Sequence, residues 1–323
     1  MQNEIKLNFL QPVLMVVDSG KFNVKGQCKS IAGEDVQLVF RTTLAETSTM
    51  MPEYQVIYDY KSYSIGDPSV AIETDSHLVT EKNSPLHQLT TLKMVAELIK
   101  EGNYPKEGIK VQLGINVPVK QYLKGAKEVE KITNMYKGEH EIVVNKEKFT
   151  FTITDVQPYF EGSGVLYNNL AKYKNSRLVI VDNGGLNSTY VPVVDLRPQG
   201  NAGSLTSGVH SLILKIQTEL SDYGLTSEQI LDILERNERT NASPKIIEDI
   251  KACLAAHVTE IHQILNNFSR TNLTKYVFTG GTSDIYREEL EKRFEFCEFS
   301  ENGLYDNVSG FYKFLEAKNK RQQ

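Results

Sequence analysis

The stretch VLMVVDSGKFNVKG, residues 13–26, decides the fold of this chain. Its opening apolar run ends on Asp18, and Ser19 and Gly20 then lead into a second β-rich piece that contains Lys25. This pattern predicts a buried strand, a tight turn and a returning strand. Gly20 lets the backbone approach a ligand closely, because it has no Cβ. A carboxylate, a backbone N–H and a lysine at one strand end suit a phosphate and its metal ion.

A second stretch has the same plan. RLVIVDNGGLNSTYVPVV spans residues 177–194, and its apolar run ends on Asp182. Gly184 and Gly185 follow, and a polar tip leads back into a β-rich run. One Asp-x-Gly turn is ordinary turn chemistry. Two copies, each after a strand of the buried type, predict a duplicated architecture with two facing loops.

A third strand, KYVFTGG at residues 275–281, also ends on glycines and precedes a helix expected from about Asp284. A strand, a Gly-Gly turn and a helix N-terminus can receive an anion or the edge of a nucleotide. Amphipathic helices are predicted from Pro85 to Gly102, from Thr206 to Leu220 and from Pro244 onward. The alternation of strands and helices predicts an α/β protein.

Other segments carry weaker patterns. Residues 54–60 predict a strand that residues 61–65 extend. Residues 149–156 predict an alternating strand, followed by a loop that begins near Pro158. A helix is expected over residues 119–135, with an interruption at a glycine.

Composition narrows the class of protein. The 323 residues suit two domains, and the net charge of −5 argues against a general nucleic-acid-binding surface. Cys28, Cys253 and Cys297 are scattered, without metal spacing or a disulfide framework, which fits a reducing cytoplasm. The sequence shows no signal peptide and no apolar run long enough to span a bilayer. It also lacks the P-loop, the G-x-G-x-x-G and the nucleophile-elbow patterns.

The three strand-end turns, in this order, resemble the nucleotide-binding motifs of the actin–Hsp70–sugar kinase superfamily. There they are phosphate loop 1, phosphate loop 2 and the adenosine loop. The resemblance is closest to bacterial actin-like proteins of the plasmid-segregation (ParM-type) group. It is carried by VVDSGKFNVKG at residues 16–26, LGINVPVKQY at 113–122 and NVSGFYKFL at 307–315.

This resemblance implies an actin-like (ribonuclease H-like) duplicated fold, with two similar domains around a nucleotide cleft. Domain I would comprise residues 1–162 plus 305–323 and contain phosphate loop 1. Domain II would comprise residues 163–304 and contain phosphate loop 2 and the adenosine loop.

The resemblance also implies ATP or GTP as the nucleotide, together with Mg²⁺. Because Mg²⁺ keeps several waters and uses few carboxylates, Asp18 and Asp182 would hold it through water. Lys25 would be a fixed cation, and successive backbone N–H groups would cradle the phosphates. The residues expected to bind the nucleotide are Asp18, Ser19, Gly20, Lys21, Lys25, Asp182, Asn183, Gly184, Gly185, Leu186, Asn187, Gly280, Gly281 and Thr282.

Hydrolysis requires a residue that orients or deprotonates water in line with the γ-phosphate. By resemblance it comes from the segment that crosses between the domains. Glu161, in PYFEGSG, is the candidate, and Gln157 is the reserve. Phe160 stands where the family usually has proline.

The implied function is that of a cytoplasmic bacterial ATPase that polymerises into dynamic filaments and drives plasmid DNA segregation. Its expected partners are further copies of itself and a DNA-binding adaptor protein at a centromere-like site. Direct contact with nucleic acid or a membrane is not expected, given the acidic charge and the absence of an anchor. The alternatives are a small-molecule (sugar-type) kinase of the same superfamily and a non-catalytic scaffold on a decayed ATPase fold.

Overall fold

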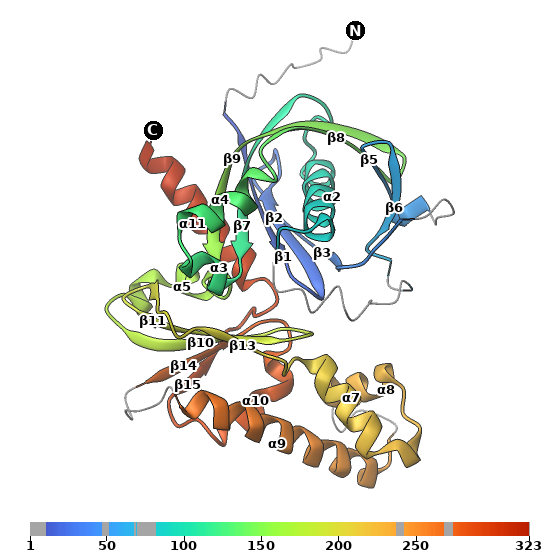
Figure 1. The fold of residues 1–323 in the computed structure, drawn as a ribbon, viewed down its shortest axis with the longest axis vertical. Coiled ribbons are helices and arrows are strands. Elements are labelled where there is room, and N and C mark those ends of the chain that lie inside the picture. Colours follow the sequence, from blue (N-terminus) through green and yellow to red (C-terminus); the bar gives the residue numbers. More distant parts are fainter. Residues whose placement is uncertain are drawn as a thin grey trace. The chain divides into compact units, whose positions relative to one another are not determined.

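The computed structural model describes residues 11–46, 52–67, 69, 82–236, 242–267 and 274–322. These residues form two compact units (Figure 1). Unit 1 contains the described residues up to Phe160 and from Val308 onward, and unit 2 contains Glu161–Asn307. The chain therefore passes from one unit to the other after Phe160 and returns after Asn307. The boundaries predicted from the sequence were 162/163 and 304/305.

Unit 1 is built on a mixed sheet with the strand order β3-β2-β1-β7-β9-β8-β5-β6-β4. β1 pairs antiparallel with β2 and parallel with β7, and β7 pairs parallel with β9. The strands are β1 (Val13–Ser19), β2 (Asn23–Lys29), β3 (Asp35–Arg41), β4 (Leu44–Glu46), β5 (Gln55–Tyr58), β6 (Lys61–Ile65), β7 (Ile109–Val117), β8 (Gly138–Val144) and β9 (Glu147–Phe160).

Helix α2 (Pro85–Glu101) supplies the main core of unit 1, and the curved sheet wraps around it in Figure 1. Its apolar stripe is buried, as the spacing predicts, with Leu92 and Val95 fully inside. Helix α11 (Asp306–Gln322) also packs on the sheet, where the Phe311 ring stacks on Tyr159 with 4.6 Å between centroids. Two short helices, α3 (Val119–Leu123) and α4 (Ala126–Asn134), confirm the predicted helix with an interruption.

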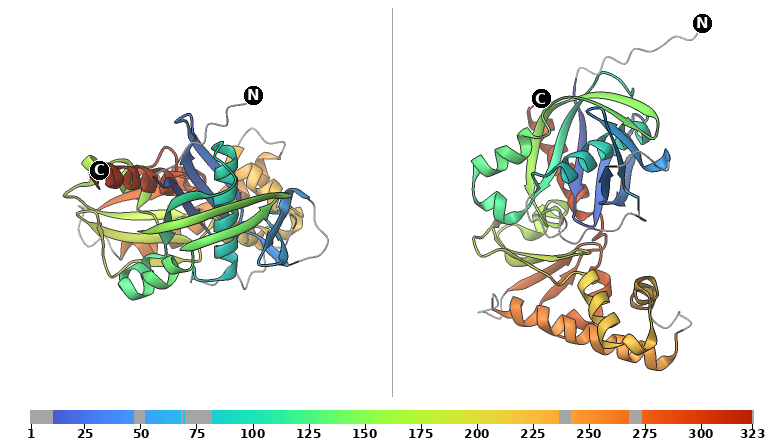
Figure 2. Two further views of the ribbon diagram at one scale, coloured as in Figure 1. Left: turned by 90° about the horizontal axis from the view of Figure 1, so that it is seen from above. Right: turned by 45° about the vertical axis from the view of Figure 1, so that its right-hand side comes forward.

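Unit 2 contains a smaller sheet with the order β12-β11-β10-β14-β15, and β13 also pairs with β11. Its strands are β10 (Arg177–Asn183), β11 (Ser188–Val194), β12 (Arg197–Pro198), β13 (Gly203–Leu205), β14 (Lys275–Thr279) and β15 (Cys297–Phe299). Its helices are α5 (Gly164–Asn168), α6 (Leu170–Tyr173), α7 (Val209–Glu219), α8 (Ser227–Arg236), α9 (Pro244–Asn266) and α10 (Ser283–Glu291). Buried side chains of α7, α9 and α10 form one core with β10 and β14, and Figure 2 shows these helices beside the sheet.

The two sheets repeat one topology. In each, an antiparallel hairpin (β1–β2 or β10–β11) is followed by two strands that add in parallel. These are β7 and β9 in unit 1, and β14 and β15 in unit 2. The repeat confirms the prediction of a duplicated α/β fold.

Three predictions about local structure were wrong. Residues 61–65 do not extend the preceding strand but return as β6, because Asp59 (φ 49°) and Tyr60 (φ 61°) form a tight left-handed turn. β9 continues through Pro158 to Phe160, along a stretch where β8 no longer pairs with it, so a proline is tolerated. α7 begins at Val209 rather than at Thr206, because β13 ends at Leu205 and residues 206–208 connect the strand to the helix.

Among the residues that the structure describes, no helix combines the length and the apolar character needed to cross a bilayer.

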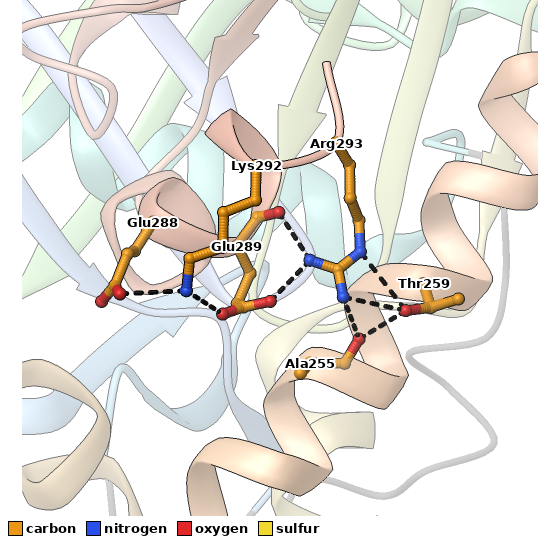
Figure 3. A network of polar contacts seen from close by, with 6 residues as sticks. All are labelled: Ala255, Thr259, Glu288, Glu289, Lys292 and Arg293. Atoms are coloured by element: carbon orange, nitrogen blue, oxygen red, sulfur yellow. Dashed lines mark hydrogen bonds and ion pairs between the residues drawn. The ribbon is translucent and has the colours of Figure 1, made fainter. Parts of the chain in front are cut away.

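Arg293 joins α10 to α9 across the surface of unit 2 (Figure 3). Arg293 lies just beyond the end of α10, and its guanidinium donates to the Glu289 carbonyl of that helix at 2.8 Å and pairs with the Glu289 carboxylate. It also donates to the Ala255 carbonyl at 3.1 Å and to the Thr259 hydroxyl at 3.0 Å, both on α9. A guanidinium has several N–H donors in one plane, so it can bond to acceptors on two helices at once more readily than the single ammonium group of a lysine.

We expect Arg293→Ala to lower the free energy of unfolding by about 1–3 kcal/mol, because it leaves acceptors on both helices without their charged donor. Lys292→Ala is the matched control, since Lys292, which follows α10, pairs with Glu288 and Glu289 of that helix and makes no bond to α9 among the described residues. It should cost no more than about 0.5 kcal/mol. Urea denaturation of the two variants measures the difference, and equal losses would contradict the bridging role of Arg293.

Candidate functional site

The first predicted loop is the turn between β1 and β2. Asp18 and Lys25 are cross-strand partners in this hairpin, and Lys25 Nζ lies 3.4 Å from Asp18 Oδ2. The turn is tied to the next strand, because the Thr42 hydroxyl donates to the Gly20 carbonyl at 2.6 Å. The structure thus brings together the carboxylate and the cation that the sequence placed seven residues apart.

Asn116, at the end of β7, holds this carboxylate from the other side. Its amide Nδ2 donates to Asp18 Oδ1, and its Oδ1 accepts the backbone N–H of Ser19 at 3.1 Å. Asn116 is not among the site residues predicted from the sequence. The available signal was an amide between two buried apolar residues, Ile115 and Val117, which has to satisfy its hydrogen bonds where it is buried.

Ser19 is held by its side chain as well, since its hydroxyl lies 2.9 Å from Nδ1 of His87 on the first turn of α2. The predicted phosphate cradle is therefore already partly engaged within the protein. The Ser19 N–H donates to Asn116, and the Gly20 N–H donates to the Asp18 carbonyl at 3.0 Å. These two N–H groups reach a phosphate only by exchanging partners.

The second predicted loop is the turn between β10 and β11. Asp182 faces Thr189 across this hairpin, and Asn183 faces Ser188. The Gly184 N–H closes the turn by donating to the Asn187 carbonyl at 3.0 Å, so this predicted cradle group is engaged too. The start of α7 is fastened to the same turn, because the His210 N–H donates to the Gly185 carbonyl at 2.8 Å.

The third predicted turn, after β14, lies against the second. Gly280 has φ +94°, and a Cβ on it would overlap the Asn183 carbonyl and the Asp182 carboxylate. Only glycine allows this close approach in this conformation. Thr282 then binds the loop directly, since its hydroxyl donates to the Asn183 carbonyl at 3.0 Å. Gly281, between them, packs against Leu304.

A second asparagine holds Asp182. The Asn307 amide Nδ2 donates to Asp182 Oδ2 at 3.2 Å, and its Oδ1 accepts the backbone N–H of Gly164 at 3.4 Å. Nothing in the sequence around Asn307 pointed to this role.

The two candidate water-orienting residues, Glu161 and Gln157, have different surroundings. Glu161 lies beside the turn between β10 and β11, because its Oε2 accepts the Thr189 hydroxyl at 3.4 Å. The next residue, Gly162, has φ +84°, a backbone conformation that favours glycine, although there is room beside it for a Cβ. Gln157 instead lies within β9, and its Oε1 accepts from Lys318 of α11.

The donor set fits a metal-bound polyphosphate. Asp18 and Asp182 each end a buried strand beside a glycine turn, and each carboxylate is held by an amide donor. In the described part of the chain no three His, Cys, Asp or Glu side chains gather around one point. Mg²⁺ needs no such cluster, since it is often bound by one or two carboxylates, several waters and the substrate phosphates.

Comparison with known proteins identifies the fold. Residues 17–164 match the family of "Actin like proteins N terminal domain". No curated protein sequence matches the chain significantly.

Solved structures with the same fold include the actin-like protein Alp7A (16% identity, TM-score 0.76, covering 97% of this chain and 98% of that one). They also include the Alp12 filament (22%, 0.71, 95% and 99%) and Bacillus thuringiensis ParM with ATP (16%, 0.69, 95% and 100%). These similarities confirm the predicted actin-like fold and the predicted resemblance to ParM-type proteins.

His257 supports the start of α7 and gives unit 2 a pH dependence. Its Nε2 lies 3.2 Å from the Ser207 carbonyl, which also accepts the Tyr286 hydroxyl. Burial lowers the pKa of His257 below its usual value, although the bond to Ser207 acts in the opposite direction. The unfolded chain therefore takes up the proton first, so this stability is present above about pH 6.5 and is lost as the pH falls.

We accordingly expect wild-type protein to lose stability between pH 7.5 and 5.5, and His257→Gln to lose less of it. Thermal unfolding midpoints at the two pH values measure this. His140→Gln tests the same effect in unit 1. It should also lose less stability than wild type between the two pH values, because burial lowers the pKa of His140 as well. An unchanged pH slope in the His257 variant would refute the assignment.

Proposed function

We propose that this chain is a ParM-type ATPase, because residues 17–164 match the N-terminal domain family of actin-like proteins and the chain has the actin-like fold. It binds Mg-ATP, polymerises into dynamic filaments and hydrolyses the nucleotide. A DNA-bound adaptor at a centromere-like site links the filament to plasmid DNA, in the cytoplasm of a bacterium.

The observation that carries this proposal is the recurrence of one half-site in both units. Each begins with a buried strand that ends on an aspartate (Asp18 or Asp182) and a glycine turn. Each aspartate is held by an asparagine amide. We infer that each half-site binds the phosphates and the hydrated metal ion of a nucleotide.

Each residue has a defined task in this proposal. Asp18 and Asp182 would accept hydrogen bonds from metal-bound waters, and Lys25 would offset negative charge beside Asp18. The backbone N–H groups of Gly185 and Leu186 would bind the phosphates, whereas those of Ser19, Gly20 and Gly184 would first have to exchange partners. Bound Mg²⁺ neutralises the charge that develops during phosphoryl transfer.

Glu161 is the proposed water-orienting residue. The Thr189 hydroxyl holds one carboxylate oxygen of Glu161, which fixes the orientation of the group. Thr189 is also the cross-strand partner of Asp182, so the same pair of strands positions the metal-side carboxylate and the hydrolytic carboxylate. Gln157 is less suited, because its side-chain oxygen is engaged by Lys318.

The assembly part of the proposal is supported by two named relatives and by charge. Alp12 was solved as a filament, and Bacillus thuringiensis ParM was solved with ATP. The net charge of −5 disfavours direct binding to DNA, which supports an adaptor protein as the link.

Adding ATP and Mg²⁺ to the purified protein should raise 90° light scattering, followed by phosphate release and decay of the scattering. GTP in place of ATP tests nucleotide preference in the same assay. Phosphate release without any rise in scattering would contradict filament formation. Transfer of phosphate to a panel of sugars, with none to water, would instead identify a sugar-type kinase.

Glu161→Gln keeps the size of the side chain but removes its charge. We expect it to assemble with ATP, to release phosphate at least about a hundredfold more slowly and to remain assembled, because general-base assistance is lost. Gln157→Ala is the comparison variant and should behave like wild type. If the Gln157 variant lost hydrolysis while Glu161→Gln retained it, the roles would be reversed.

A further inference from the structure

Asn116 and Asn307 make the same pair of contacts in the two units. In each, the amide nitrogen donates to a phosphate-loop aspartate, Asp18 or Asp182. The amide oxygen of each accepts a backbone N–H, from Ser19 in unit 1 and from Gly164 in unit 2. Both asparagines are buried, with exposed fractions of 2% and 8%.

The backbone N–H groups fix which way each amide points. A main-chain N–H can only donate, so it requires the oxygen of the amide on its side. The NH₂ group is then directed at the carboxylate. This arrangement suits an ionised aspartate, which only accepts hydrogen bonds, and it fixes the rotation of the carboxyl group.

The two asparagines do not occupy equivalent places in the duplicated fold. Asn116 lies on β7, the parallel neighbour of β1. In unit 2 the parallel neighbour of β10 places Thr279 opposite Asp182, and the Thr279 hydroxyl bonds to Asp306 instead. Asn307, at the start of α11, supplies the amide that the repeated strand lacks. Different elements of the two units supply the same amide-to-carboxylate hydrogen bond. This indicates that the bond is needed by the aspartates and is not merely a by-product of the sheet topology.

We propose that Asn116 and Asn307 are positioning residues for the metal-bound nucleotide, each acting through its aspartate. This inference rests on the proposed function, since it assigns Asp18 and Asp182 to the waters of Mg²⁺. Each amide holds one carboxylate oxygen, so that the carboxylate meets the hydrated ion in a fixed orientation. Groups that orient metal-binding residues in this way typically contribute about 10–100-fold to metal affinity.

The test compares the ATP affinity in excess Mg²⁺ with that in EDTA, by calorimetry, for wild type, Asn116→Ala and Asn307→Ala. The ratio of the two affinities should fall about tenfold or more in each variant. A purely structural role would change stability or both affinities together, and would leave the ratio unchanged. Affinity is measured on folded molecules, so partial unfolding lowers the signal but not the ratio.

Two control variants remove the same kind of bond elsewhere. Gln112, also on β7, donates its amide to Asp155 at 3.3 Å, and Gln217, on α7, donates its amide to the Leu225 carbonyl at 3.2 Å. Gln112→Ala and Gln217→Ala should keep the wild-type ratio. If an alanine variant fails to fold, Asn116→Leu or Asn307→Leu keeps the approximate size of the side chain but removes the donor, and the ratio should fall there too.

The outcomes separate the inference from the function on which it rests. If wild type binds ATP in a Mg²⁺-dependent way and both asparagine variants keep its ratio, the positioning role is wrong and the proposed function stands. A fall in only one variant removes the other residue from the proposal. If wild type shows no Mg²⁺-dependent binding of ATP, the proposed function fails, and this inference fails with it.

Discussion

The parallel pairing of β1 with β7, and of β10 with β14, is the constraint on which the candidate site depends. Parallel strands bring their carboxyl ends to the same edge of a sheet. In unit 1 this places Asn116 beside Asp18, and in unit 2 it places Gly280 and Thr282 against the turn after Asp182. Antiparallel pairing of the same strands would send these groups to opposite edges.

This arrangement places the carboxylate of Asp18 among apolar strands, where an ionised group loses its hydration. Asp18 is only 3% exposed, and burying an ionised group is unfavourable unless donors or an opposite charge replace its water. Lys25 supplies the charge and Asn116 the neutral donor. A polar set of this kind is a poor way to stabilise a fold, since apolar side chains of similar volume often do as well. The set at Asp18, and the amide that holds the half-buried Asp182, agree with the proposed role of the two aspartates in binding a ligand.

The sequence predicted the hairpins, the main helices and the duplication, because each depends on residues that lie close together in the chain. Strand periodicity and an Asp-Gly ending are local signals. The supports of the site depend on distant pairs: 98 residues separate Asp18 from Asn116, and 125 separate Asp182 from Asn307. No spacing rule in a single sequence reports such contacts.

The asparagines that hold the two aspartates lie on different kinds of element: Asn116 is on a strand, and Asn307 is on the first turn of a helix. Asn116 belongs to a central strand of unit 1, whose ladder fixes it on both sides, so Asp18 is set by the sheet itself. Asn307 is the last residue of unit 2 before the chain continues as the rest of α11 in unit 1. Gly164 is pressed against the backbone of Asp306 and Asn307, and a side chain there would overlap it. A shift of this first turn of α11 would therefore reach Asp182 through the Asn307 amide.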